Sequence, residues 1–242
     1  MTGKGRLSIG RHWQYLSRRQ VVGGGAGPLA AIGAVDCALW DIKGKEANLP
    51  VYALLGGPTR ERIRLYVHLA GDSPEELADD ARRRLAEGYT AVRFYPLGQF
   101  NGGLFGDASY TAIARIVEDR VSAVREAVGP DIDVMIDVVN RLTPPEALLV
   151  ARVCAPYNLY FFEDPIEPDS MEAQAAFTSR SPVPVATGER LQTIYQFNDL
   201  LSRNAAAFIR PDISLAGGIS GIKKIAAIAE AHYVGVIPHN PM

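Results

Sequence analysis

Three apolar runs in the second half of the chain end in a carboxylate, and the interval between these acids is constant. VMID ends on Asp137, LYFFE on Glu163 and VPVATGE on Glu189, so that 26 residues separate each acid from the next. One acid where a chain leaves a sheet is common. Three acids at one interval predict a repeating unit that presents a carboxylate at the same place each time.

The repeat extends over most of the chain. From about residue 64, short β-branched or aromatic runs alternate with longer stretches of helical period, and no two of the runs are adjacent. This order predicts parallel strands joined by crossover helices. The nearly constant interval favours a closed (β/α) barrel over an open doubly wound sheet. The seven expected strands are 64–70, 91–97, 133–137, 159–164, 183–189, 206–212 and 234–240.

Helix signals stand between the expected strands. Ser73 is a predicted N-cap, followed by Pro74 and two acids, and Gly88 comes just after the helical stretch. Thr143 begins a second helix in the same way, and a third is expected over 218–232. Residues 28–47 are also strongly helical and precede the barrel pattern.

Composition limits the class of protein. The chain has 242 residues, 48% of them hydrophobic and 21% charged, with a formal net charge of −2. These values are typical of a soluble globular protein and give no general attraction to nucleic acid or to anionic membranes. Two cysteines without metal-ligand spacing, and no apolar stretch of membrane-spanning or signal-peptide length, favour the cytoplasm.

One long loop, 98–110, follows the second expected strand. It is rich in glycine and contains aromatic residues, and it stands where barrel active sites form. Both a lid over substrate and a disordered insertion fit this composition.

In a parallel barrel the carboxyl ends of all strands lie at one face. Asp137, Glu163 and Glu189 would then converge there, and three carboxylates at close range repel one another unless a cation neutralises them. A divalent ion with oxygen ligands does so, and Mg²⁺ suits carboxylates that leave positions open for substrate. The alternative is that each acid pairs with a nearby arginine or caps the next helix.

Two later expected strands also end in residues that suit acid–base catalysis. Asp212 and His239 would lie on adjacent strands, where the carboxylate can orient the imidazole as a general base. On the second strand, alternation aims Arg93 and Tyr95 the same way. Arg93 suits a substrate carboxylate and Tyr95 suits proton donation, although both also suit packing.

Taken together, these motifs resemble the enolase superfamily, in particular the mandelate racemase group and its sugar-acid dehydratases of the galactonate and mannonate type. The resemblance runs through nearly the whole chain, in AVDCALWDIKGKEANLPVYALLGG, IDVVNR, FFEDP, ATGER, RPDISLAGGI and PHNPM. It implies a TIM-type (β/α)7β barrel with an N-terminal capping domain, and a carbon–oxygen lyase.

The resemblance also implies roles for individual residues. Asp137, Glu163 and Glu189 match the family's three Mg²⁺ ligands, and Asp212 with His239 matches its Asp/His dyad. His239 would remove the proton next to the carboxylate of an acid sugar, and the β-hydroxyl would then leave to give a 2-keto-3-deoxy acid.

Two departures from the family pattern concern the acid that assists the leaving hydroxyl. Val139 stands where related dehydratases often carry a histidine, and Arg93-Phe94-Tyr95 replaces the usual Lys-x-Lys. Tyr95, Tyr110 or protonated His239 are the remaining sources of that proton. A racemase or epimerase of the same superfamily is therefore the alternative within this chemistry.

A third departure concerns length. Family members have a complete capping domain and an eighth strand, whereas this chain is expected to hold a remnant of the first in 1–60 and a barrel truncated after its seventh strand in 61–242. Exposed strand edges would favour a homo-oligomer or a partner. A non-catalytic remnant that needs such a partner is the alternative outside enzymology.

Overall fold

The structure is a computed structural model that describes residues 8–18, 25–98 and 108–240. Most of the predicted lid, the segment 99–107, lies outside the described residues. Within the described part of the chain, no helix is both long enough and apolar enough to cross a membrane.

The chain divides into two compact units, which we call the strand unit and the helical unit. Each has its own internal packing and is described by itself. The strand unit consists of Arg64–Thr187 and Arg203–Phe208, and the helical unit consists of Met1–Ile63, Gly188–Ser202 and Ile209–Met242.

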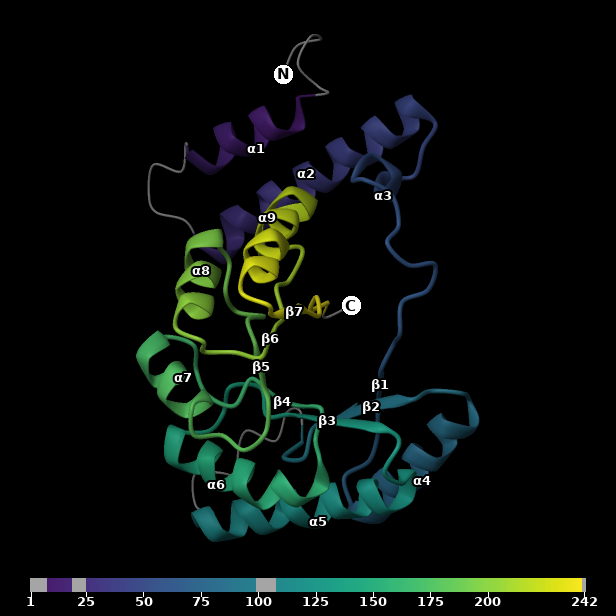
Figure 1. The fold of residues 1–242 in the computed structure, drawn as a ribbon, viewed down its shortest axis with the longest axis vertical. Helices are drawn as coiled ribbons and strands as arrows, with labels where there is room; N and C mark the ends of the chain where they lie inside the picture. Colours follow the sequence, from purple (N-terminus) through teal and green to yellow (C-terminus); the bar gives the residue numbers. More distant parts are fainter. Residues whose placement is uncertain (1–7, 19–24, 99–107, 241–242) are drawn as a thin grey trace. The chain divides into compact units, whose positions relative to one another are not determined.

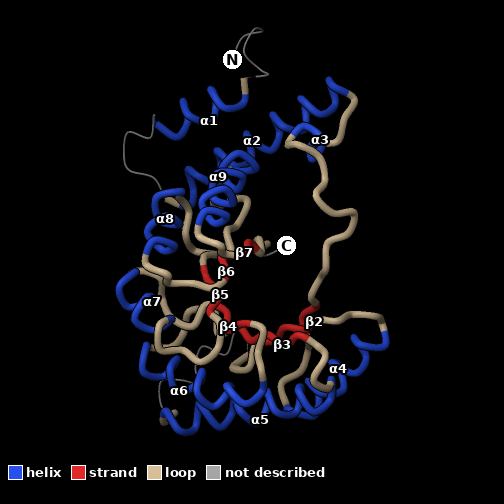
Figure 2. The backbone as a smooth tube through the Cα atoms, viewed as in Figure 1, coloured by secondary structure: helices blue, strands red, loops and turns tan. Residues whose placement is uncertain are grey.

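The strand unit alternates strands and helices, as the sequence predicts. Its strands are parallel and pair in chain order, and Figures 1 and 2 show α4, α5 and α6 along one side of them. The strands are β1 (Val67–His68), β2 (Ala91–Phe94), β3 (Asp133–Asp137), β4 (Phe161–Glu163) and β5 (Val185–Thr187), with Phe208 of β6 (Phe208–Ile209). The helices are α4 (Pro74–Ala86), α5 (Tyr110–Val128), α6 (Pro144–Cys154), the 3-10 turn η1 (Ala155–Tyr157) and α7 (Met171–Thr178).

Strand alternation decides which side chains reach the core of this unit. Val92 and Val134 are partners across β2 and β3, and both are completely buried in the cluster that includes α5. The next residue on each strand faces the other way, since successive side chains point to opposite faces. Arg93, Asp137 and Glu163 consequently share the face of the sheet opposite this helix-covered core.

The predicted helix starts are confirmed. Ser73 caps α4 through a capping box, in which its Oγ accepts from the amide of Glu76 at 3.2 Å and the Glu76 carboxylate accepts from the Ser73 amide at 3.3 Å. Thr143 and Glu146 form the corresponding box at α6. Each box satisfies amide donors that the first helical turn leaves without an internal partner.

All seven expected strands exist, but most are shorter than the sequence predicts. The run 183–189 ends at Thr187 because Gly188 has φ 130°, and a Cβ there would lie 2.9 Å from the Phe197 ring. The runs 91–97, 206–212 and 234–240 contain prolines, which have no amide hydrogen for the ladder. Glu189 is therefore a turn residue, two positions beyond β5.

The helical unit contains five helices and the last strand residues among its described residues. Their bounds are α1 (Ile9–Arg18), α2 (Ala26–Ala47), α3 (Val51–Leu54), α8 (Ile194–Ser202), α9 (Gly218–Ala231) and β7 (Gly235–Val236). Parallel pairing with β6 continues beyond β7, since the amides of Ile237 and His239 donate to the carbonyls of Ile209 and Pro211. This pairing positions His239.

A buried acid joins α2 to the start of α9. Asp36 is 2% exposed and accepts from both the amide of Ser220, at 2.9 Å, and its hydroxyl, at 2.6 Å. The same hydroxyl oxygen accepts from Trp40 Nε1 at 3.0 Å. Gly218 permits the approach, because a Cβ at this position would lie 2.7 Å from the Asp36 carboxylate.

Ser220→Ala is expected to lower the free energy of unfolding by about 1–3 kcal/mol, because it leaves buried Asp36 and Trp40 each short of a partner. Urea denaturation of the parent and the variant measures the change. Ser179→Ala is the matched control, since the Ser179 side chain is exposed and its hydroxyl donates to the carbonyl of Ala176 in the adjoining helix. An equal effect in the two variants would contradict the role assigned to Ser220.

Burial also sets the chemistry of one cysteine. Cys154 in α6 is completely buried, and this burial raises the pKa of its thiol to about 12. A thiol of that kind stays protonated and unreactive at neutral pH. Cys154 is therefore a packing residue of the strand unit.

Candidate active site

Two predicted metal ligands lie side by side in the strand unit. Asp137 ends β3, Glu163 ends β4, and the two residues are direct partners across the strands. Their exposed fractions are 3% and 0%. Asp137 Oδ1 accepts from the amide of Val139 at 2.8 Å, which fixes the orientation of that carboxylate.

The guanidinium of Arg93 neutralises this carboxylate pair. Its Nη1 lies 3.1 Å from Asp137 Oδ2 and also donates to Glu163 Oε2. Burial alone would lower the pKa of Arg93, but the charges of Glu163 and then Asp137 outweigh it and raise the pKa above its ordinary value. A single positive group thus stands where two carboxylate oxygens converge.

Aromatic and imidazole groups surround the same guanidinium. Nη2 of Arg93 donates to the Tyr95 hydroxyl at 3.0 Å and lies 3.4 Å from His68 Nδ1. The rings of Tyr95 and Tyr66 lie 5.3 and 5.6 Å from the guanidinium carbon, within cation–π range. The expectation that Arg93 and Tyr95 point the same way is confirmed.

The backbone just after these carboxylates adopts uncommon conformations. Val139, Asn140 and Asp164 have φ of 55°, 58° and 43°, and the amide of Asn140 donates to the carbonyl of Asp164 at 2.7 Å. Positive φ is tolerated by asparagine and aspartate, but for a β-branched valine it is a true outlier. Such strain concentrates where a chain must aim groups at a functional site.

Asp164 is a further buried acid of this cluster. It directly follows Glu163, is 1% exposed and accepts from the hydroxyl of Thr187, the last residue of β5, at 2.6 Å. No role was expected for Asp164 from the sequence. Its positive φ turns the chain away from the direction of β4. Glu163 and Asp164 therefore do not simply alternate between the two faces of the sheet.

Asp212 and His239, the predicted Asp/His dyad, are in contact in the helical unit. His239 Nδ1 lies 2.9 Å from Asp212 Oδ2, and the backbone of the two residues is paired as a parallel bridge. The other oxygen, Asp212 Oδ1, accepts from the amides of Ser214 at 2.7 Å and Leu215 at 3.0 Å. These bonds fix the carboxylate, which in turn fixes the imidazole plane.

Glu189 approaches the opposite edge of the same imidazole. Its Oε2 lies 3.2 Å from His239 Nε2. A hydrogen bond here requires a proton on Nε2, because a carboxylate oxygen can only accept. The nitrogen that a general base would use is therefore held by a predicted metal ligand.

The predicted site residues thus form two clusters, one in each unit. Arg93, Tyr95, Asp137 and Glu163 are in contact in the strand unit, and Glu189, Asp212 and His239 are in contact in the helical unit. Arg93 binds the carboxylates of Asp137 and Glu163, as in the arginine-pairing alternative, because all three side chains share one face of the sheet.

Comparison with protein families assigns most of the chain. Residues 76–242 match the enolase C-terminal domain-like family, and residues 3–56 match the N-terminal domain of mandelate racemase / muconate lactonizing enzyme. The chain belongs to the mandelate racemase / muconate lactonizing enzyme family of the enolase superfamily. The predicted fold class, a TIM-type (β/α) barrel present in part together with part of the N-terminal domain, is confirmed.

Curated relatives give more detail. D-galactonate dehydratase of Verminephrobacter eiseniae is 34% identical over 242 residues, which is 100% of this chain and 62% of that protein. D-galactonate dehydratase of Xanthomonas oryzae pv. oryzae is 35% identical with the same coverage. This chain therefore spans less than two thirds of the length of these relatives.

Solved structures also resemble nearly the whole of this chain while extending beyond it. An enolase from Agrobacterium radiobacter with bound Na and L-malate has a TM-score of 0.90 at 32% identity, covering 100% of this chain and 61% of that one. The 3,6-anhydro-D-galactonate cycloisomerase of Zobellia galactanivorans has a TM-score of 0.86 at 31% identity, covering 98% and 64%.

Proposed function

We propose that this chain carries the catalytic groups of a Mg²⁺-dependent acid-sugar dehydratase, which removes the proton next to a carboxylate and eliminates the β-hydroxyl to give a 2-keto-3-deoxy acid. The contact between Asp212 and His239 carries the proposal, because a fixed carboxylate behind an imidazole is the arrangement that a general base needs. The names of the curated relatives support this class of reaction.

The donor set fits a divalent cation. Asp137 and Glu163 offer hard oxygen ligands, and their oxygens already converge on one cationic atom, Arg93 Nη1, which stands in for a metal ion. In this proposal Asp137, Glu163 and Glu189 hold Mg²⁺. When bound, Mg²⁺ supplies positive charge against the negative charge that develops on the substrate carboxylate.

Proton transfer is assigned to side chains of this chain. Asp212 keeps the Nδ1 proton of His239 in place, so that Nε2 accepts the substrate proton once it no longer contacts Glu189. The Tyr95 hydroxyl, which accepts a hydrogen bond from Arg93, is assigned as the donor of a proton to the departing hydroxyl. Tyr95 would thereby replace the histidine that related dehydratases often carry at the position of Val139.

The metal part of the proposal is tested by thermal unfolding of the 242-residue chain in excess Mg²⁺ and in EDTA, with Asp137→Ala in parallel. A transition that rises with Mg²⁺ in the parent and not in the variant is expected from linkage between binding and folding. A parent transition that is indifferent to Mg²⁺ would contradict the metal site.

The reaction is tested by incubating the protein with D-galactonate and other aldonates in D₂O with Mg²⁺. A keto-deoxy product indicates elimination. Deuterium at C2 with all hydroxyls retained indicates proton abstraction followed by reprotonation, and it would replace dehydration by epimerisation. If no aldonate gives either product, the result would favour the alternative that this chain acts only with a partner.

The division of the chain belongs to the same proposal. Residues 1–60 would be part of the capping domain with its linking helix, and 61–242 part of the barrel. The substrate would be a small acid sugar, and the assembly a homo-oligomer. Sedimentation velocity of the purified chain checks the last point.

A further inference from the structure

A cavity of about 400 Å³ lies within the helical unit, among α1, α2, α8 and α9. All of its lining residues belong to this unit, and none of them is a predicted site residue. The volume falls within the range of sites that take small molecules. The cavity is therefore a candidate binding site separate from the proposed chemistry.

The charged groups that line this cavity are both cations. Arg18 comes from the end of α1 and Lys224 from α9, and none of the described residues that line the cavity is acidic. Lys224 Nζ lies 3.3 Å above the centroid of the Trp13 ring, and Trp13 Nε1 donates to the carbonyl of Gly217 at 2.7 Å. The ring is fixed by this bond, so that it holds the ammonium at the cavity wall.

The environment of Lys224 leaves its charge short of polar partners. Partial burial lowers the pKa of this ammonium, and the nearby carboxylate of Asp36 opposes the effect only in part. An anion in the cavity would offset that cost of burial.

The remaining lining residues suggest what else such a molecule contains. Leu29, Ile194 and Ala216 present apolar surface, and Gln192 and Thr193 come from the start of α8. A bare inorganic anion would leave that apolar surface uncovered. An apolar body carrying one anionic group matches both parts of the wall.

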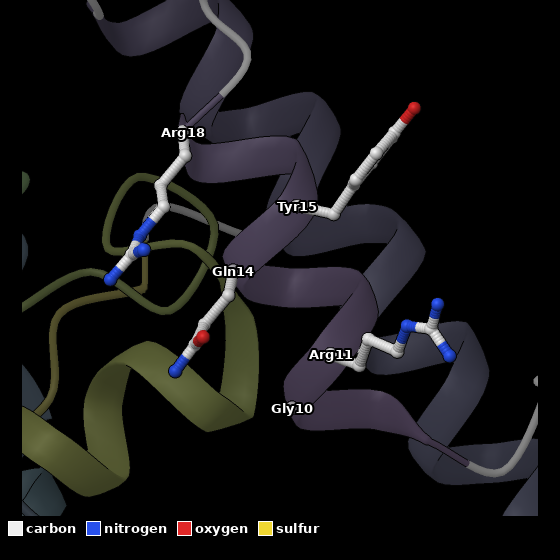
Figure 3. Close-up of a pocket in the computed structure, with 5 residues that line it drawn as sticks. All are labelled: Gly10, Arg11, Gln14, Tyr15 and Arg18. Atoms are coloured by element: carbon white, nitrogen blue, oxygen red, sulfur yellow. The ribbon is translucent and has the colours of Figure 1, made fainter.

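A second hollow adjoins the cavity at α1. Gln14 and Arg18 also line this hollow of about 490 Å³, together with Arg11 and Tyr15. Figure 3 shows Gln14 and Arg18 pointing to one side of α1 and Tyr15 pointing to the other. Arg18 is exposed and Lys224 is half-buried.

We propose that this cavity binds a small organic monoanion with an apolar body, its anionic group held between Arg18 and Lys224. The proposal does not depend on the proposed function, since the cavity shares no residue with the predicted catalytic and metal-binding groups.

The test is a titration of the 242-residue chain with 4-fluorobenzoate, followed by ¹⁹F NMR of the ligand in EDTA. EDTA removes divalent ions, so that a metal at the proposed active site does not contribute. Saturable binding is expected for 4-fluorobenzoate, with binding at least about tenfold weaker for neutral 4-fluorobenzamide, because the amide lacks the negative charge that Arg18 and Lys224 would contact. Equal binding of the two ligands, or no saturable binding, would overturn the proposal.

Two variants test whether the ligand binds in this cavity. Lys224→Met is expected to weaken binding at least about tenfold, and Arg18→Gln should also weaken it. Lys223→Met is the matched control, because Lys223 is the neighbour on the same helix and does not line the cavity. Arg18 is exposed, so that its replacement does not disturb packing. Unchanged affinity in both Arg18→Gln and Lys224→Met would assign the bound anion to another place.

Discussion

His239→Asn is expected to lower the rate of deuterium exchange at C2 of a substrate acid sugar by about 100-fold to 10,000-fold, the range that a positioned general base contributes. Asparagine keeps a polar group of similar reach near Asp212 but cannot take up a proton. Proton NMR of the aldonate in D₂O with Mg²⁺ measures exchange separately from elimination. The parent must first show exchange for the comparison to apply.

His232→Gln is the matched control for this prediction. His232 follows the last residue of α9 and has no role in the predicted site, so that its replacement should leave exchange within about twofold of the parent. Thermal melts of both variants exclude unfolding as the cause. Exchange in His239→Asn at more than a tenth of the parent rate would remove His239 as the base.

Arg93→Met is expected to lower the free energy of unfolding in EDTA by about 3–5 kcal/mol. The substitution leaves Asp137 and Glu163 buried beside each other without the guanidinium that neutralises them, and an uncompensated buried charge is strongly destabilising. Urea denaturation in EDTA measures the loss. Excess Mg²⁺ should restore part of it, because the ion would replace the missing positive charge.

Arg82→Met is the comparison for Arg93. Arg82 pairs with Asp79 at 2.7 Å on the exposed face of α4, and an exposed pair of this kind contributes at most about 1 kcal/mol. A loss in Arg93→Met no larger than that in Arg82→Met would show that the carboxylate pair does not depend on the arginine. A loss that Mg²⁺ does not reduce would separate Arg93 from the proposed metal site.

Periodic features of the fold were predictable from the sequence. The capping residues Ser73 and Thr143 begin helices where the pattern of serine or threonine, proline and glutamate indicates, because capping is decided by a few neighbouring residues. The order of strands and helices follows from hydrophobic period in the same local way. Strand length was less predictable, because the end of the run at Gly188 depends on contact with Phe197, which the run itself does not contain.

The site was predictable in its residue types and only partly in its contacts. The Asp212–His239 contact was anticipated because both residues end neighbouring strands. The pairing of Asp137 and Glu163 with an arginine was one of the alternatives that the sequence left open, since an arginine on that face fits a substrate carboxylate as well as a protein one. The positive φ of Val139 left no signal at all, because valine is among the residues that least favour that conformation.

Arg93 has a consequence for the order of events during maturation of the protein. Many small metal proteins are unfolded until the ion arrives, since their ligands repel one another or lack other partners. Here a tethered cation already occupies the point between two acids, so that the strand unit needs no ion to reach its native state. In the proposed metal site, Mg²⁺ would then bind to a protein that is already folded and stabilise it further, and chelation would leave that folded protein behind, ready to bind the ion again.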